Sequence, residues 1–130
     1  MRSKSSVWGW SLNSAVACGR FFIVFACVFG LLAVALGAFG AHALASNIPE
    51  SRQATWATAV EYHMFHVLGM LALAAVFRDV QSPWAVRAQA SFIIGICLFS
   101  GSLYALVIFD LPVLGAVTPL GGVCLMLGWL

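Results

Sequence analysis

Residues 21–39 read FFIVFACVFGLLAVALGAF, an unbroken apolar run without a charged side chain. A helix needs roughly 20 apolar residues, each rising about 1.5 Å, to cross a hydrocarbon core about 30 Å thick. Three further runs of similar character follow it, within residues 59–77, 88–109 and 113–130. Together the four runs take up most of the 130 residues, so they predict a small membrane protein with little mass outside the bilayer.

The composition agrees with this prediction. Hydrophobic residues make up 63% of the chain and charged residues only 8%, whereas a soluble domain carries roughly 25% charged residues. Inside lipid every backbone amide needs a partner within the protein, which leaves helices and closed barrels as spanning structures. The apolar runs are continuous, whereas barrel strands alternate over about ten residues. We therefore predict an all-α integral membrane protein, an antiparallel bundle of four transmembrane helices.

The chain is expected to divide into two parts. Residues 1–20 form a polar lead, and residues 21–130 form the four-helix transmembrane domain. The spans are expected at about 21–41, 57–77, 88–109 and 113–130. The first run is longer than the roughly 7–15 apolar residues of a cleaved signal peptide, so we interpret it as a span.

The connections between the spans carry local signals. Residues 110–112 are too few for anything but a tight connection, so spans three and four should be antiparallel neighbours. Pro49 followed by Glu50 predicts the start of a short surface helix. Trp56 is expected at the membrane interface. Pro119, inside the fourth run, removes a backbone donor and should kink or loosen that helix.

The basic residues are distributed unevenly. One side of the predicted bundle carries five of them: Arg2, Lys4, Arg20, Arg78 and Arg87. The opposite side carries only Arg52. The positive-inside rule then places both termini in the cytoplasm, for a multi-pass protein of the bacterial inner membrane. So few dispersed charges indicate no nucleic-acid partner, and the lipid bilayer is the expected surrounding.

Small residues recur every four positions along two of the predicted spans. They are Ala33, Gly37 and Ala41 on the first span, and two series on the third, Ser91 and Gly95, and Cys97, Gly101 and Ala105. In lipid, helices associate through close van der Waals contact, which small side chains permit. These positions therefore predict helix-packing faces, and they are consistent with self-association or membership of a larger membrane complex.

Polar and ionisable groups inside a span are costly, so each is a candidate functional residue. The candidate polar cluster consists of His42, Tyr62, His63, His66, Ser100, Ser102 and Tyr104. At about 100° per residue, Tyr62, His63 and His66 share one helix face, whereas Glu61 points roughly 140° away from His66. Glu61 is expected to reach the interface or to pair with Arg52.

A metal or haem site is the sharpest alternative for this cluster. His42, His63 and His66 could supply three nitrogens to zinc or copper. The order of residues is not the zincin HExxH pattern, because the two histidines of the second span are three apart and the glutamate precedes both. No paired carboxylates or activated nucleophile accompany them. We therefore predict no catalytic residues, no cofactor and no enzymatic activity.

Several segments together have a familiar pattern. They are LGAFGAHAL at residues 36–44, WATAVEYHMFH at 56–66, FSGSLY at 99–104, TPLGG at 118–122 and GW at 128–129. This combination resembles the YgdD-like family of small bacterial inner-membrane proteins. The resemblance implies four spans and no established biochemical function, and it supplies no catalytic residues. It includes most of the polar cluster in the family pattern, but His63 stands where the family more often has glutamine.

Three functions remain open from the sequence. The first is a non-enzymatic membrane protein whose polar cluster organises the bundle and which associates with itself or with a membrane complex. The second is binding or transport of a small ligand, a lipid or a proton at His42, Tyr62 and His66. The third is metal or haem binding through His42, His63 and His66.

Overall fold

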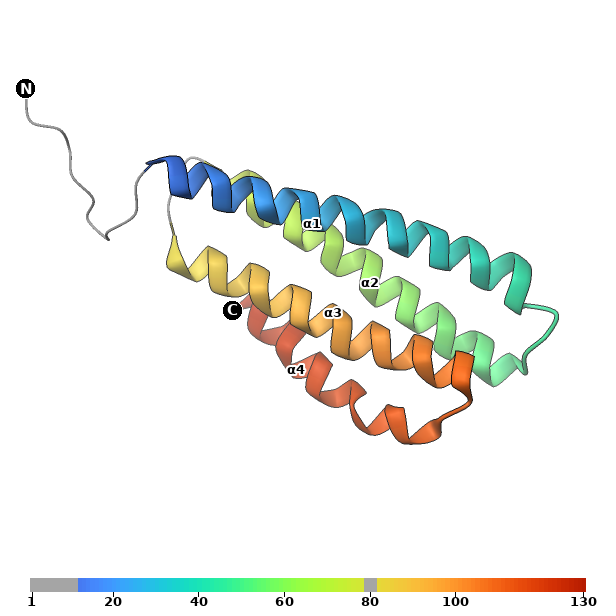
Figure 1. The fold of residues 1–130 in the computed structure, drawn as a ribbon. Coiled ribbons are helices and arrows are strands. Elements are labelled where there is room, and N and C mark those ends of the chain that lie inside the picture. Colours follow the sequence, from blue (N-terminus) through green and yellow to red (C-terminus); the bar gives the residue numbers. More distant parts are fainter. Residues whose placement is uncertain (1–11, 79–81) are drawn as a thin grey trace, which may run out of the picture.

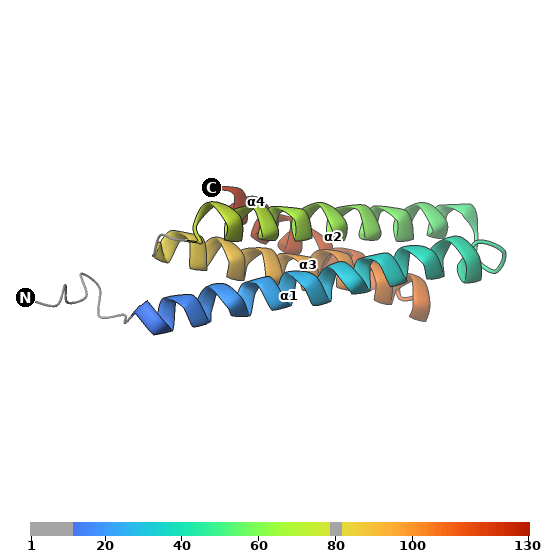
Figure 2. The same cartoon turned by 90° about the horizontal axis from the view of Figure 1, so that it is seen from above.

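A computed structural model describes residues 12–78 and 82–130, and within these ranges it contains helices and short connections. The helices are α1 (Leu12–Phe39), α2 (Glu50–Val76), α3 (Pro83–Phe109) and α4 (Thr118–Trp129), with a π-helical segment η1 (Gly40–Leu44) and a 3₁₀ segment η2 (Pro112–Ala116). Successive helices run antiparallel, and the start of α1 lies at the same end as the C-terminus (Figures 1 and 2). The predicted all-α bundle is confirmed.

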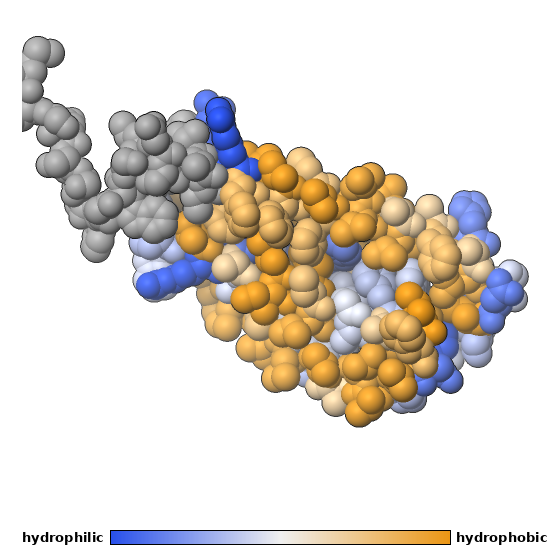
Figure 3. Space-filling view, in the orientation of Figure 1, coloured by the Kyte–Doolittle hydropathy of each residue, from blue (hydrophilic) through white to orange (hydrophobic). Residues whose placement is uncertain are grey.

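Four segments of the described chain are long and apolar enough to cross a bilayer: Gly19–Leu44, Glu50–Val76, Pro83–Phe109 and Pro112–Trp129. Hydrophobic side chains cover most of the molecule's middle, and the strongly hydrophilic groups gather mainly towards its two ends (Figure 3). Large apolar side chains such as Leu31 and Val34 are exposed on α1. Such a surface is stable only against acyl chains, because water would have to hydrate it.

Helix α3 lies at the centre of the bundle. In its most apolar stretch 44% of the residues are buried, compared with 11% for the span of α1. Helix α3 packs against α2 and α4, whereas α1 packs chiefly against α2. The strongest contacts therefore join helices that follow one another in the chain, and all four helices, from Ala26 of α1 to Leu125 of α4, also contribute to one buried cluster.

The contact between α1 and α2 uses the small residues of α1. Ala33 is fully buried, and Gly37 lies against the side chain of Val60. The packing face predicted for Ala33 and Gly37 is confirmed, but Ala41 is exposed within η1. Helix α1 also begins at Leu12, so the helical segment starts inside the predicted lead 1–20; the rest of the lead, residues 1–11, lies outside the described residues.

The connection between α3 and α4 is tight, as predicted. Asp110 ends α3 in the left-handed conformation, at φ 50°. Its backbone N–H and that of Leu111 both bond to the carbonyl of Leu106, which satisfies the helix end. The last span is then broken at Val117, between η2 and α4, and Pro119 lies in the first turn of α4. Pro119 thus loosens this span, because proline fits a helix start but not a helix interior.

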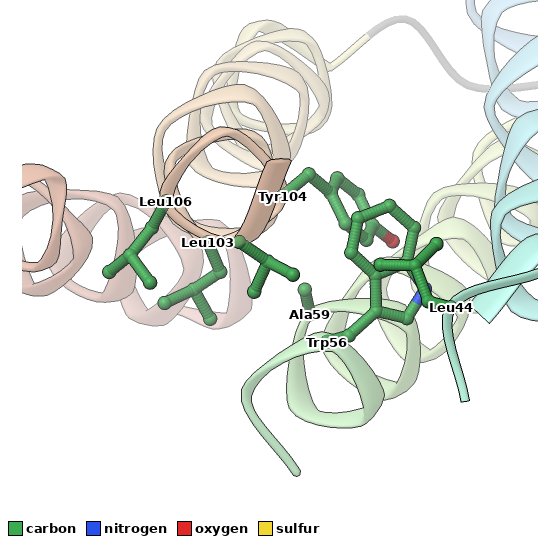
Figure 4. Packing of buried hydrophobic residues seen from close by; sticks show 7 residues of the cluster. Leu44, Trp56, Ala59, Leu103, Tyr104 and Leu106 are labelled. Atoms are coloured by element: carbon green, nitrogen blue, oxygen red, sulfur yellow. The ribbon is translucent and has the colours of Figure 1, made fainter. Parts of the chain in front are cut away.

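One prediction about the first loop is wrong, and Trp56 near it has contacts that the sequence did not indicate. Pro49 precedes a helix, but that helix is the whole of α2 and not a short surface helix. Trp56, which we predict at the membrane interface, is buried within the bundle, and its ring packs 4.7 Å from the Tyr104 ring (Figure 4). It donates its indole N–H to the Leu36 carbonyl at 2.9 Å. Gly40 makes room for this indole, since a side chain there would overlap it.

Candidate functional site

The predicted polar cluster separates into several places in the structure. His63 lies between three helices and is buried. Its Nδ1 is 3.3 Å from the Tyr104 hydroxyl on α3, and its ring meets the Phe29 ring of α1 edge-on at 5.6 Å. Its Nε2 is buried and has no hydrogen-bond partner among the described residues. His63 therefore belongs to the interior of the bundle.

The two serines of α3 have different surroundings. The Ser102 hydroxyl lies 2.9 Å from the Thr118 hydroxyl of α4 and 3.0 Å from the Phe99 carbonyl, to which it donates. Ser100 is fully buried, and its hydroxyl bonds to none of the described residues. Ser102 thus joins two helices, whereas the buried hydroxyl of Ser100 has no compensating bond to a described residue.

A groove of about 330 Å³ opens on α2 and is lined by Glu61, Tyr62, Phe65 and His66. The Tyr62 ring stacks on the Phe99 ring of α3 at 4.5 Å and lies 6.0 Å from the His66 ring. The exposed side chains of Glu61 and Phe65 form the rest of the lining. The groove therefore combines aromatic rings with a carboxyl group and an imidazole, within the apolar span.

The chemistry of His66 at this groove follows from one hydrogen bond. Its Nδ1 lies 2.7 Å from the Tyr62 carbonyl oxygen, one turn earlier on α2. A carbonyl oxygen only accepts, so Nδ1 carries the proton and donates. In the neutral imidazole the other nitrogen, Nε2, then has a free lone pair. The Nε2 of neutral His66 can therefore accept a hydrogen bond.

Glu61 is exposed whereas His66 is buried, in line with the predicted difference in direction. The two residues nevertheless line the same groove, because residues 61 and 65 lie along one side of it and residues 62 and 66 along the other. Arg52 does not pair with Glu61; it forms an ion pair with Asp110, which joins the start of α2 to the α3–α4 connection. Glu61 makes no ion pair or hydrogen bond with any described residue.

The three histidines do not come together. His42 is exposed within η1 and makes no hydrogen bond or ring contact with the described part of the chain. His63 faces α1 and α3, whereas the His66 ring meets Phe92 of α3 and Trp129 of α4. Among the described residues no three His, Cys, Asp or Glu side chains are grouped so as to hold a metal ion. The geometry therefore does not favour the three-histidine site.

One polar residue escaped the sequence prediction. Gln89 is buried in α3, and its amide donates to the Met70 carbonyl of α2 at 2.8 Å. The sequence analysis did not single it out among the residues of the third span. The available signal was a lone amide side chain among apolar residues, which is costly in lipid unless it is bonded.

The fold and the groove define a polytopic membrane protein with a polar recess on one transmembrane helix. Residues 36–122 match the family described as "Protein of unknown function (DUF423)". The chain belongs to this family, as the resemblance in the sequence had implied.

Named relatives agree with the family. The chain is 42% identical over 112 residues to UPF0382 membrane protein YwdK of Bacillus subtilis (strain 168), covering 85% of this chain and 91% of that protein. It is 40% identical over 110 residues to UPF0382 inner membrane protein YgdD of Escherichia coli (strain K12), covering 85% and 84%. UPF0382 membrane protein SERP0230 of Staphylococcus epidermidis is 36% identical over 113 residues, covering 85% and 90%. No solved structure matches the chain significantly.

Proposed function

We propose that this protein is a non-enzymatic membrane protein that binds a small, membrane-soluble molecule in the groove on α2. One observation supports this function above the others: Glu61, which bonds to no described residue, lines a recess that opens on the surface of a transmembrane helix, together with aromatic rings and the largely buried His66. An ionisable group in a span is costly unless something offsets it. A ligand that fills the recess supplies that compensation.

The chemistry of the lining supports a binding role over a catalytic one. The groove is lined by a carboxyl group, an imidazole, a phenol and a phenyl ring. Neither a serine, a threonine nor a cysteine is among these lining residues. An acid–base pair for catalysis would also require a reacting group held between its members, and the Nδ1 of His66 is already bonded to its own helix.

Photolabelling tests the binding role. A single-chain amphiphile with a diazirine near its polar end is added to membranes that contain the full chain, and cross-linked peptides are mapped. We expect labelling of residues 61–66 to exceed labelling of the more exposed α1 surface around Leu31. Phe65→Trp, which fills the groove, should reduce the signal, whereas Leu31→Trp should not. Labelling that only follows exposed apolar area would overturn the proposal.

Self-association is a second candidate function, and one face of α3 favours it. Cys97 is exposed, and a side chain added at Gly101 would meet nothing closer than the Ile96 carbonyl of its own helix, at 4.0 Å. The stripe formed by Cys97, Gly101 and Ala105 is therefore not filled by a helix of the same chain. Such a stripe lets a second helix backbone approach closely in lipid, and a second copy of this chain is the partner we propose for it.

We also propose that both termini lie in the cytoplasm of a bacterium and that the spans cross its inner membrane. Arg20, Arg78 and Arg87 lie towards one end of the bundle, whereas Arg52 and Asp110 pair at the other. This asymmetry supports the orientation, and the name of the Escherichia coli relative supports the membrane. A C-terminal fluorescent protein should fluoresce, and a C-terminal alkaline phosphatase should be inactive; the reverse pattern would invert the orientation.

A further inference from the structure

We infer that the ligand of the α2 groove is an amphiphilic amine, with a primary ammonium group on a single apolar chain. This inference rests on the proposed binding function and adds the chemical class of the ligand. It follows from the groups at the groove defined above, from their position along α2, and from the apolar surface that continues beyond them.

The groove presents acceptors. His66 is a largely buried member of the lining, and its Nε2 carries the free lone pair because Nδ1 donates to the Tyr62 carbonyl. The carboxylate form of Glu61 only accepts, and the Tyr62 hydroxyl can do either. Neither a lysine nor an arginine lines the groove, and Arg52 on the same helix is already paired with Asp110. A ligand that satisfies these groups must therefore bring N–H or O–H donors.

Charge and aromatic surface restrict the donor further. A carboxylate in an apolar setting is stabilised by a positive partner and destabilised by a negative one. The Tyr62 and Phe65 rings also line the groove, and the faces of aromatic rings attract ammonium groups. An ammonium ion meets all of these conditions together, because it carries positive charge and three N–H donors. An alcohol meets only the need for donors, and a carboxylate meets none.

Position and size favour a single-chain molecule. Glu61 lies nine residues after Arg52 on α2, which corresponds to about 13 Å along the helix axis. This places the groove well below the ion pair that marks the polar end of the bundle. A volume of about 330 Å³ is near the lower limit for small-molecule sites, so it suits a head group and a few carbons.

The apolar part of the ligand has a continuous path. Residues 61, 65 and 68 follow one stripe of α2, and Phe65 and Leu68 are 58% and 57% exposed. An ammonium group at Glu61 would leave its alkyl chain against Phe65 and Leu68, pointing towards the middle of the bilayer. The chain thus remains in contact with lipid while the charged end is held in the groove.

The test uses competition against the photolabel in phosphatidylcholine nanodiscs, whose head groups lack N–H donors. Dodecylamine, dodecyltrimethylammonium, dodecanol and dodecanoate are compared at equal mole fractions in the membrane. We expect dodecylamine to displace the label from residues 61–66 at a mole fraction about tenfold or more below that of dodecanol or dodecanoate. Dodecyltrimethylammonium, which keeps the charge but has no N–H, should be intermediate.

Two matched variants locate the effect. Glu61→Gln removes the charge from the groove and should abolish the advantage of dodecylamine, whereas Glu50→Gln makes the same change at the start of α2 and should preserve it. The ligand series on the unaltered chain is conclusive even when a variant does not fold. Equal displacement by amine and alcohol overturns the ammonium inference but leaves the binding function standing. Absence of specific labelling at residues 61–66 overturns the binding function itself.

A further arm distinguishes the source of the ammonium group. Nanodiscs that contain phosphatidylethanolamine offer the same primary ammonium on a two-chain lipid. We expect this lipid to compete poorly, because its head group stays at the interface, above the level of Glu61. Strong competition by phosphatidylethanolamine that Glu61→Gln abolishes would overturn the single-chain assignment, while preserving the ammonium chemistry.

Discussion

Several polar side chains inside the spans connect neighbouring helices. The Trp56 indole of α2 donates to α1, the Gln89 amide of α3 donates to α2, and the hydroxyls of Ser102 and Thr118 join α3 to α4. In lipid there is no hydrophobic force between helices, so such bonds and close packing decide which faces meet. Single polar residues therefore fix the order of the helices.

The two serines of α3 provide a matched test of this role. Ser102→Ala removes a bond between helices, and we expect it to lower the free energy of unfolding by roughly 0.6–1.7 kcal/mol. Ser100→Ala removes a buried hydroxyl that bonds to none of the described residues, so it should leave stability unchanged or slightly higher. Thermal unfolding in detergent, followed by circular dichroism, compares the two. A larger loss from Ser100→Ala than from Ser102→Ala would contradict this account.

The sequence identified most of the polar residues inside the spans, but it did not show which of them contact one another. Helical angles correctly placed Tyr62 and His66 together, because both belong to one regular helix. They could not show that His63 turns to Tyr104 while His66 turns to Trp129, since that depends on where α1 and α4 lie. The sequence placed Glu61 on a different helix face from His66. The helical angle between two residues does not show whether a broad groove is lined by both of them.

At the scale of the helices, glycine decides how closely α3 and α4 approach. A side chain at Gly121 would overlap the backbone of Leu98 and Phe99, which cannot rotate away. At Gly122 the nearest foreign atom is the Phe99 ring at 3.7 Å, an ordinary contact. The two helices can therefore lie against each other only where the smallest residue faces the partner backbone.

This contrast gives a second prediction. Gly121→Ala should force α3 and α4 apart and lower the free energy of unfolding by about 1–3 kcal/mol. Gly122→Ala adds the same methyl group one residue later and should have little effect, or raise stability slightly through helix propensity. Urea or heat unfolding of both variants in the same detergent gives the comparison. Equal losses would show that the overlap at Gly121 is relieved by a small shift.

The spans themselves were predictable because length and hydropathy determine them directly, whatever the tertiary packing. The ends of the spans were less predictable from the sequence. Helix α1 extends back to Leu12, since the residues before the apolar run are also compatible with a helix. Trp56 resembled an interfacial anchor, and only the position of Gly40 and the Leu36 carbonyl on another helix explains why it is buried.

For the whole molecule, the packing of the helices leaves one face of α3 uncovered. Because α1 packs chiefly on α2, and α4 covers a different side of α3, the outward stripe meets lipid in the single chain. The exposed side chains of Ile94 and Ile108 extend this stripe beyond Cys97 and Gly101. A second copy that packs there would bury the face and place the Cys97 thiols of the two chains near each other.

Disulfide cross-linking in native membranes tests this arrangement directly. Cys18→Ser, Cys27→Ser and Cys124→Ser together leave Cys97 as the single thiol, and copper phenanthroline should then convert most of the chain to a covalent dimer. The matched control retains only Cys27, which is exposed on α1, and should remain monomeric. Gly101→Leu in the Cys97 background should suppress the cross-link, because a large side chain there keeps the two backbones apart. Equal cross-linking through Cys27, or none through Cys97, would refute the α3 interface and leave lipid as the covering of this face.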